Sequence, residues 1–278
     1  MMESAQSNQD AYKQVYNWQY VHSIDFWSIV LARTCDVQQG GSDLKPLVYP
    51  LVQVSLGAIK CVHISSAFYD SCGTRLVPNS RSHPFHLHVI RSLLHLIRHT
   101  ETYIPLFPYI LPVLTLPFST SSRPKASTLR PLDLELHIRV PNQYLKTRVL
   151  TEGVVEESVY LLAEWLTSRP VHGSIAFPEV VIPVAAALRK AMKSSKHGGS
   201  GKDLNVVKML LERVEEGARW VEQKRNGLQI SPAKIAEVQD WERDLRNKIS
   251  ESPLAKYFKV QQKARERQKN MIEKVSSF

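Results

Sequence analysis

Three apolar segments interrupted by proline recur along the chain and restrict the folds that it can adopt. They begin at Pro46, Pro108 and Pro178 and read PLVYPLVQV, PYILPVL and PEVVIPV. Proline breaks the hydrogen-bond ladder of a central strand, whereas a helix tolerates it in the first turn and bends around it further in. Each segment follows a more regular amphipathic helix. Paired helices of this kind predict an all-α fold, namely an irregular α-solenoid of the HEAT or armadillo type, with a compact helical bundle as the alternative.

The helical pattern divides the chain into three predicted parts. Residues 1–195 form a body of helical repeats, and residues 196–250 add two amphipathic helices of the same solenoid after the Gly-rich linker KHGGSG. Residues 251–278 form a basic helical tail. Within the body, apolar and polar residues alternate over 132–140, which is the period of a half-buried strand. We therefore expect one short extended segment there.

The segment from Tyr12 to Leu31 is apolar on every side of a helix, which is typical of a helix inside a larger α-helical body. On this helix His22 and Asp25 lie three residues apart and can face each other. The pair is either structural, satisfying a buried carboxylate, or a catalytic acid and base. The residues expected to shape this helix and the proline-bent helices are Trp18, Asp25, Trp27, Pro46, Pro50, Pro178 and Pro183.

The composition excludes several classes of protein. Of the 278 residues 43% are hydrophobic, which is enough for a sizeable core and excludes disorder over the whole length. The three cysteines contain no CxxC pair, so a secreted disulfide scaffold is excluded. We expect no signal peptide, because the first ten residues lack an apolar run. The uncharged stretch 102–122 has the length of a membrane span, but its four prolines argue against one.

Motifs for catalysis are absent from the sequence. It contains no GxSxG, HExxH or Gly-rich dinucleotide motif, so we predict a protein that is not an enzyme and has no cofactor. KHGGSGKD lacks the first glycine of a phosphate-binding loop and places Asp203 where Ser or Thr would hold magnesium. His88, His95 and His99 share the helix face opposite an apolar stripe. The three histidines form a solvated face, a surface that faces an anion or RNA, or a zinc site. Because no Cys or carboxylate nearby completes a set of zinc ligands, we expect no metal.

The net charge of +10 indicates either an anionic partner or merely a soluble surface. The loop 141–148 combines cations with an aromatic ring, which suits phosphate contact and base stacking, although many such clusters are only solvated surface. Together with two arginines of the histidine-bearing helix, the candidate RNA-binding residues are Arg139, Tyr144, Lys146, Arg148, Arg91 and Arg98.

More than half of the excess positive charge lies after residue 195, and much of it is in the tail. We expect the tail to be a single solvated helix or a flexible arm that binds a polyanion. Its basic residues are Lys256, Lys259, Lys263, Arg265, Arg267 and Lys269.

Six stretches carry a resemblance to a known family, and they occur in its order over most of the chain. The family is the nucleolar complex protein 2 family of ribosome-assembly factors, and because its members are usually much longer, the chain resembles their C-terminal portion. The stretches are YNWQYVHSIDFW (16–27), LKPLVYPLVQVSLG (44–57), YIPLFPYILPVL (103–114), YLKTR (144–148), IAFPEVVIPV (175–184) and SPLAKYF (252–258).

The resemblance implies a non-enzymatic α-solenoid scaffold of the nucleolus and nucleoplasm. It implies a role in the maturation and intranuclear transport of large-subunit (60S) pre-ribosomes. The implied partners are nucleolar complex proteins 1 and 3, the pre-60S particle and pre-rRNA, with no membrane and no small-molecule substrate. The alternative is a HEAT-type nuclear adaptor or carrier that binds only proteins, with the basic tail as a localisation signal.

Overall fold

Helices form the regular structure of the chain. The computed structural model describes residues 13–37, 40, 42–67, 80–119, 124–194, 200–226 and 235–276, and within these ranges it contains no β-strand. The predicted all-α fold is therefore confirmed. The helices are α2 (Trp18–Thr34), α3 (Val48–Ala67), α4 (His83–Thr100), α5 (Phe107–Ser119), α6 (Arg148–Thr167), α7 (Arg169–His172), α8 (Phe177–Ser194), α9 (Gly201–Arg225), α10 (Ile235–Lys248) and α11 (Pro253–Ser276).

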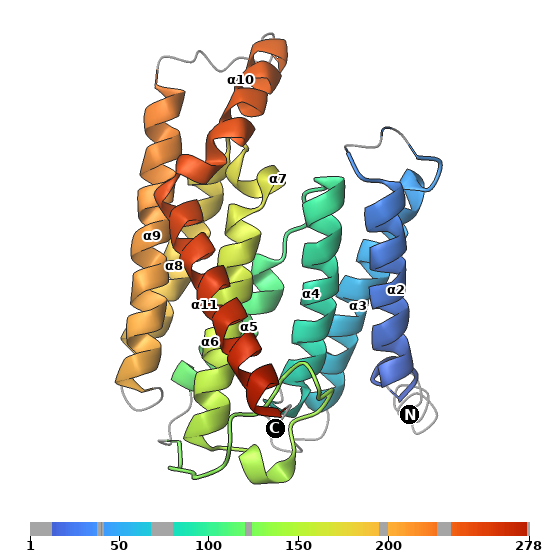
Figure 1. Ribbon diagram of the computed structural model, residues 1–278, viewed down its shortest axis with the longest axis vertical. Coiled ribbons are helices and arrows are strands. Elements are labelled where there is room, and N and C mark those ends of the chain that lie inside the picture. Colours follow the sequence, from blue (N-terminus) through green and yellow to red (C-terminus); the bar gives the residue numbers. More distant parts are fainter. Residues whose placement is uncertain are drawn as a thin grey trace.

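The helices stack side by side as successive pairs (Figure 1). Helix α3 packs with α4, α5 with α6 and α8 with α9, while α2 lies against both α4 and α3. Helices α4, α6 and α9 follow one another across the stack, and α5 packs against α8 behind them. Helix α11 crosses the outside of the stack against α6 and α9. This arrangement is compatible with the predicted α-solenoid.

The core is built around α4 and α6. Leu87, Ile90 and Ile97 of α4 are fully buried, because other helices surround α4 on most sides. Trp165 of α6 is 1% exposed, and its Nε1–H donates to the carbonyl of Ile104 at 2.8 Å. The indole thus attaches the non-helical residues that precede α5 to helix α6. The same bond satisfies the polar group of the indole.

Pro46, Pro50 and Pro178 lie at or near the starts of helices. Pro46 lies in a 3₁₀ turn, Lys45–Leu47, that leads directly into α3. Pro50 and Pro178 lie in the first turns of α3 and α8, where a backbone N–H has no partner within the helix. Pro183 lies further inside α8.

The uncharged stretch forms a short helix with prolines inside it. Residues 101–106 are non-helical, and α5 then begins at Phe107 with Pro112 and Pro117 in its interior. None of the helices in the described ranges is both long enough and apolar enough to span a membrane.

The interpretation of 132–140 as a strand is wrong. The backbone bends at 134–136 and 138–139, and the N–H of Val140 donates to the carbonyl of Arg81 at 2.9 Å. Leu134 is buried, but Leu136 is 73% exposed, so the alternating residues do not share one face. An alternating segment becomes a strand only beside a second strand, and the described part of the fold offers none.

Helix α2 is buried on one side only, which contradicts the expected internal helix. Val21, Ile24 and Leu31 are buried, whereas Phe26 is 59% and Trp27 is 47% exposed. The reason is its position, because α2 lies at the end of the described stack and has neighbours on one side only (Figure 1).

Candidate functional site

The predicted RNA-binding loop is closed by backbone pairing just before α6. The N–H of Lys125 donates to the carbonyl of Lys146, and the N–H of Arg148 donates to the carbonyl of Lys125, both at 2.9 Å. Thr147 between them caps α6, since its Oγ1 accepts the N–H of Leu150 at 3.3 Å. Lys146 has a left-handed backbone with φ of 63°. The pairing places Lys125 beside Thr147, a long-range contact that the sequence pattern did not indicate.

The other members of the loop cluster already have contacts. The guanidinium of Arg139 lies over the ring of Tyr16, 5.0 Å from its centroid. The hydroxyl of Tyr144 donates to the carbonyl of Arg130, which lies before the loop, at 3.1 Å. Nε of Arg148 donates to Glu152 at 2.6 Å. The structure thus brings Tyr144, Lys146 and Arg148 together in one loop, and RNA contact by them stays a prediction.

Arg91 and Arg98 project from α4 toward carboxylates of α6. Arg91 donates through Nε and Nη2 to Glu157 at 3.0 and 2.7 Å, and Arg98 is paired with Glu164. Each arginine therefore helps to hold α4 against α6. RNA contact by these two residues also stays a prediction, and it would compete with these ion pairs.

The basic tail forms α11, whose inner side is anchored on the stack. Leu254 and Phe258 are buried, and Arg265 reaches Glu157 at 2.7 Å and Glu135 at 3.1 Å. Lys269 bonds to Glu135 at 3.2 Å. Burial opposes the charge of Arg265, but the two glutamates outweigh it and raise its pKa.

The pKa of Glu135 reflects the same opposition between burial and ion pairing. Burial opposes its charge, yet the hydrogen bond from Lys269 and the nearby Arg91 and Arg265 hold its pKa below the usual value. The inner cations of α11 are thus structural ion-pair partners of the loop and of α6.

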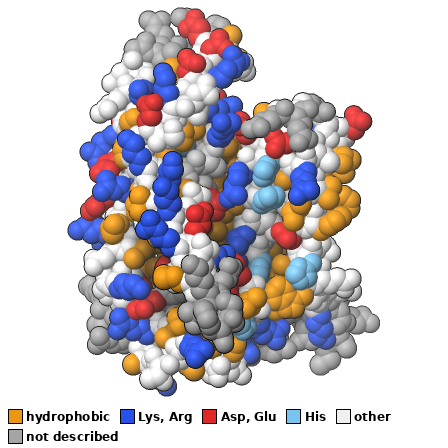
Figure 2. Space-filling model, in the orientation of Figure 1, with side chains coloured by type: hydrophobic (Ala, Val, Ile, Leu, Met, Phe, Trp, Pro, Cys, Tyr) orange, Lys and Arg blue, Asp and Glu red, His pale blue; other side chains and the backbone are white. Residues whose placement is uncertain are grey.

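The outer side of α11 carries a different set of cations, all exposed to solvent. Figure 2 shows Lys and Arg side chains gathered over the region of α9 and α11. We call the exposed set the outer stripe of α11, and it consists of Lys256, Lys259, Lys263 and Arg267.

The three histidines of α4 are half-buried, so the expectation of a solvated face is wrong. Nε2 of His88 donates to the carbonyl of His137 at 3.1 Å, and Nδ1 of His99 lies 3.1 Å from Asp36. Burial is the main cause that lowers the pKa of both His88 and His95. Among the described residues, no three His, Cys, Asp or Glu side chains are grouped to hold a metal ion.

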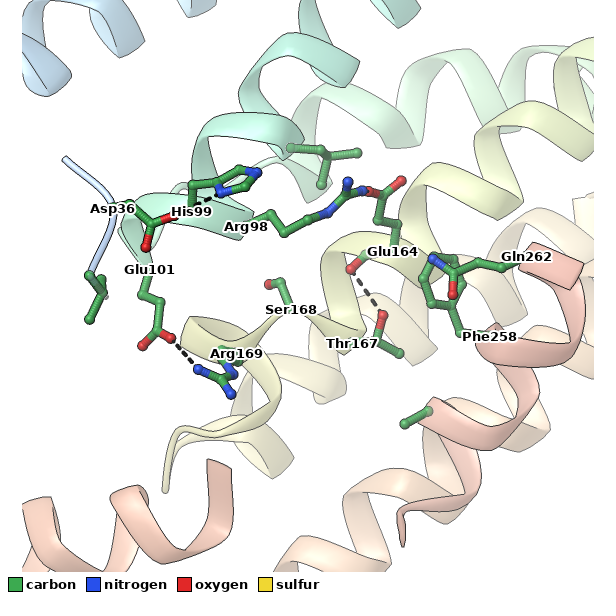
Figure 3. A pocket seen from close by; sticks show the side chains of 13 residues that line it. Asp36, Arg98, His99, Glu101, Glu164, Thr167, Ser168, Arg169, Phe258 and Gln262 are labelled. Atoms are coloured by element: carbon green, nitrogen blue, oxygen red, sulfur yellow. Dashed lines mark hydrogen bonds and ion pairs between the residues drawn. The ribbon is translucent and has the colours of Figure 1, made fainter. Parts of the chain in front are cut away.

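An open cavity of about 540 Å³ lies between α4, the end of α6 and α11 (Figure 3). Its charged side chains face one another across it as pairs, including Arg169 with Glu101 at 2.8 Å. His99 with Asp36 and Arg98 with Glu164 form two further pairs in its wall. The charged groups that line the cavity are thus already engaged with one another, and none of these pairs points to a particular ligand.

The remaining sequence candidates have structural roles. Asp25 accepts from Oγ of Ser92 at 3.1 Å, while His22 stacks on Trp18 with ring centroids 5.3 Å apart. His22 and Asp25 therefore do not form the expected pair. Asp203 completes a capping box at the start of α9 with Ser200, and residues 196–199 of KHGGSGKD lie outside the described ranges.

The end of the stack exposes large apolar side chains on neighbouring helices. Figure 2 shows hydrophobic side chains gathered over α2. Scattered exposed apolar residues are ordinary, but aromatic and aliphatic side chains concentrated on a terminal helix pair indicate an interaction site. We call this set the apolar α2/α3 surface, and it consists of Phe26, Trp27, Ile29, Leu47, Tyr49 and Val54.

Comparison with known proteins gives a match over most of the chain. Residues 2–69 and 72–261 match the sequence model of the Noc2p family. The chain is 33% identical over 276 residues to a NOC2 family protein of Schizosaccharomyces pombe, which covers 96% of this chain and 35% of the relative.

Two further relatives carry descriptive names. Nucleolar complex protein 2 of Drosophila melanogaster is 29% identical over 90% of this chain and 29% of its own length. Nucleolar complex-associated protein 2 of Arabidopsis thaliana is 27% identical over 95% of this chain and 31% of its own length. The chain thus spans about a third of the length of these relatives.

Proposed function

The chain belongs to the Noc2p family, and we propose that it is a non-enzymatic ribosome-biogenesis factor of the nucleolus and nucleoplasm. In this proposal it serves as a scaffold in the maturation and intranuclear transport of pre-60S particles. It binds partner helical proteins, namely nucleolar complex proteins 1 and 3, and it contacts pre-rRNA through its basic surface. The names of the Drosophila and Arabidopsis relatives support the nucleolar complex as its setting.

The observation that carries the proposal is the apolar α2/α3 surface. Trp27 and Tyr49 are 47% and 70% exposed on the helices at the edge of the described stack, where large apolar side chains are concentrated rather than scattered. Large aromatic side chains are the residues that contribute most to protein interfaces. A further helical protein that stacks on α2 and α3 would bury them and continue the array.

The test is a pull-down of nucleolar complex proteins 1 and 3 with the full chain and with the variant Phe26→Ala/Trp27→Ala/Tyr49→Ala. Loss of one aromatic anchor at an interface costs about 2 kcal/mol or more, which is about 30-fold in affinity, so we expect the triple variant to bind at least about 30-fold more weakly. The control variant Leu136→Ala/Ile182→Ala/Met209→Ala removes three apolar side chains that are equally exposed elsewhere. Partner binding that is equal in both variants would contradict the proposal.

RNA contact through the loop is tested separately with the variant Arg139→Glu/Lys146→Glu/Arg148→Glu. We expect it to weaken RNA binding and to flatten the dependence of affinity on salt, because fewer phosphates are neutralised. An unchanged salt slope would remove the loop from the proposal.

A further inference from the structure

Helix α11 separates its cations by face. Arg265 and Lys269 lie on the inner side, where Glu135 and Glu157 hold them. Lys256, Lys259, Lys263 and Arg267 are exposed, and within the described part of the chain none of the four forms an ion pair with a carboxylate. The sequence alone presents all six as one basic tail.

The inner contacts fix the rotation of the helix about its own axis. Leu254 and Phe258 are buried near one end of α11, and Arg265 is held further along it. The guanidinium of Arg265 also lies over the ring of Tyr160, 4.4 Å from its centroid. Since these anchors lie on one side of the helix, the opposite side always faces solvent.

The outer stripe is a regular row on that opposite side. Successive members are three, four and four residues apart, so on a helix with about 100° per residue they fall within a sector of about 80°. With a rise of about 1.5 Å per residue, the row is about 16 Å long. Glu266 lies at its edge, and the four cations outnumber it.

We propose that the outer stripe of α11 binds the sugar–phosphate backbone of RNA without reading its sequence. This inference rests on the proposed function, since it names the surface through which the scaffold touches ribosomal precursor RNA. Lysine and arginine neutralise phosphates and release counterions, and a row of four held in register by a docked helix suits a continuous phosphate chain.

The packing of α11 argues against a membrane surface as the partner. A helix that lies on a lipid surface inserts its apolar face, but the apolar side of α11 is already buried against the stack. The exposed side carries only scattered apolar residues, such as Val260 and Met271.

The experiment measures binding of the purified full chain to a single-stranded RNA at several salt concentrations. The test variant replaces all four stripe residues with Gln. The matched control Arg33→Gln/Lys45→Gln/Lys190→Gln/Lys193→Gln removes the same charge from exposed positions outside α11. A second variant, Lys256→Arg/Lys259→Arg/Lys263→Arg, keeps the charge. Circular dichroism and limited proteolysis of α11 establish that each variant is folded.

The stripe variant is expected to lower the slope of log affinity against log salt by about 3, because each phosphate that is no longer neutralised accounts for about 0.7. At about 0.15 M salt, taken relative to about 1 M, this corresponds to a reduction in affinity of about 200-fold. The charge-matched control should lose much less affinity, and the Arg variant should bind as the wild type does. Equal reductions in the stripe variant and the control would overturn the inference.

Two other outcomes would also overturn the inference while leaving the proposed function intact. In one, the stripe variant loses binding to polyglutamate but binds RNA normally, which would assign the stripe to an acidic protein. In the other, the stripe variant is impaired only in nuclear import, which would make the tail a localisation signal. If the variant of the apolar α2/α3 surface still binds its partner proteins, that result contradicts the proposed function but does not bear on the outer stripe.

Discussion

His172 at the end of α7 provides a quantitative test of how the helices are packed. The residue is fully buried, with the ring of Phe177 at 4.2 Å and that of Trp220 at 6.1 Å between centroids. Burial lowers the pKa of His172 to about 4, compared with about 6.5 in an unfolded chain. The folded protein therefore keeps this imidazole neutral at pH values where the unfolded chain protonates it.

The sign and size of the effect follow from this difference. Above about pH 6.5 the imidazole is neutral in both states, and the stability is fully retained. As the pH falls from about 6.5 to about 4, the unfolded chain takes up the proton and the free energy of unfolding decreases. The full loss is about 3 kcal/mol, of which about 2 kcal/mol is reached at about pH 5.

The measurement is urea unfolding at about pH 7.5 and about pH 5, followed by circular dichroism. The variant His172→Gln removes the titrating group, so its loss of stability on acidification should be smaller than that of the wild type by about 2 kcal/mol. Because burial also lowers the pKa of His88 and His95, some loss should remain in this variant. His22→Gln, at an exposed position, should behave as the wild type does. The reasoning is refuted if the wild type and His172→Gln lose equal stability.

Four further substitutions test the packing of the helices and the ion pair that anchors α11. Gly217→Ala should destabilise the fold by about 1–2 kcal/mol, because its Cβ would lie 3.1 Å from Cβ of Leu254. Gly153→Ala should stabilise it by about 0.5–1 kcal/mol, because no atom lies within 4 Å of the added methyl group. Urea unfolding of both variants checks this pair, and changes of the same sign would contradict it. Trp165→Phe should lower the free energy of unfolding by about 1–3 kcal/mol in the same assay, because the buried carbonyl of Ile104 loses its hydrogen-bond donor. A change near zero would argue against that hydrogen bond. Glu157→Gln should weaken the docking of α11 by about 2 kcal/mol and speed the cleavage of α11 by trypsin. The control Glu156→Gln, at an exposed position, should have neither effect. Equal cleavage of the two variants would argue against Glu157 as an anchor of α11.

Local patterns predicted most of the helices, because helical periodicity and proline placement act over a few residues. The prolines at 50 and 178 lie in first turns, and the apolar stripe around Leu87 and Ile90 is buried as expected. The same reasoning failed at 132–140, where strand periodicity had no second strand to pair with. It also failed for α2, since an apolar helix looks the same whether it lies inside a stack or at its end.

The exposure of the candidate RNA-binding cations depends on contacts between distant residues more than the positions of the helices do. Arg265 and Arg267 are indistinguishable as members of a basic tail, yet one is held by carboxylates and the other is exposed. The partner that distinguishes them, Glu135, is 130 residues away from Arg265 in the sequence. A one-dimensional count of charges cannot detect such pairing.

The sequence by itself determined the all-α fold, the positions of most helices and, through the resemblance of its motifs, the Noc2p family. These properties follow from short-range periodicity and from motif order, both of which are written along the chain. The tertiary structure alone decided which apolar helix lies at the end of the stack and which cations of α11 remain exposed. Those properties depend on burial and ion pairing between distant segments, and such contacts exist only after the chain has folded.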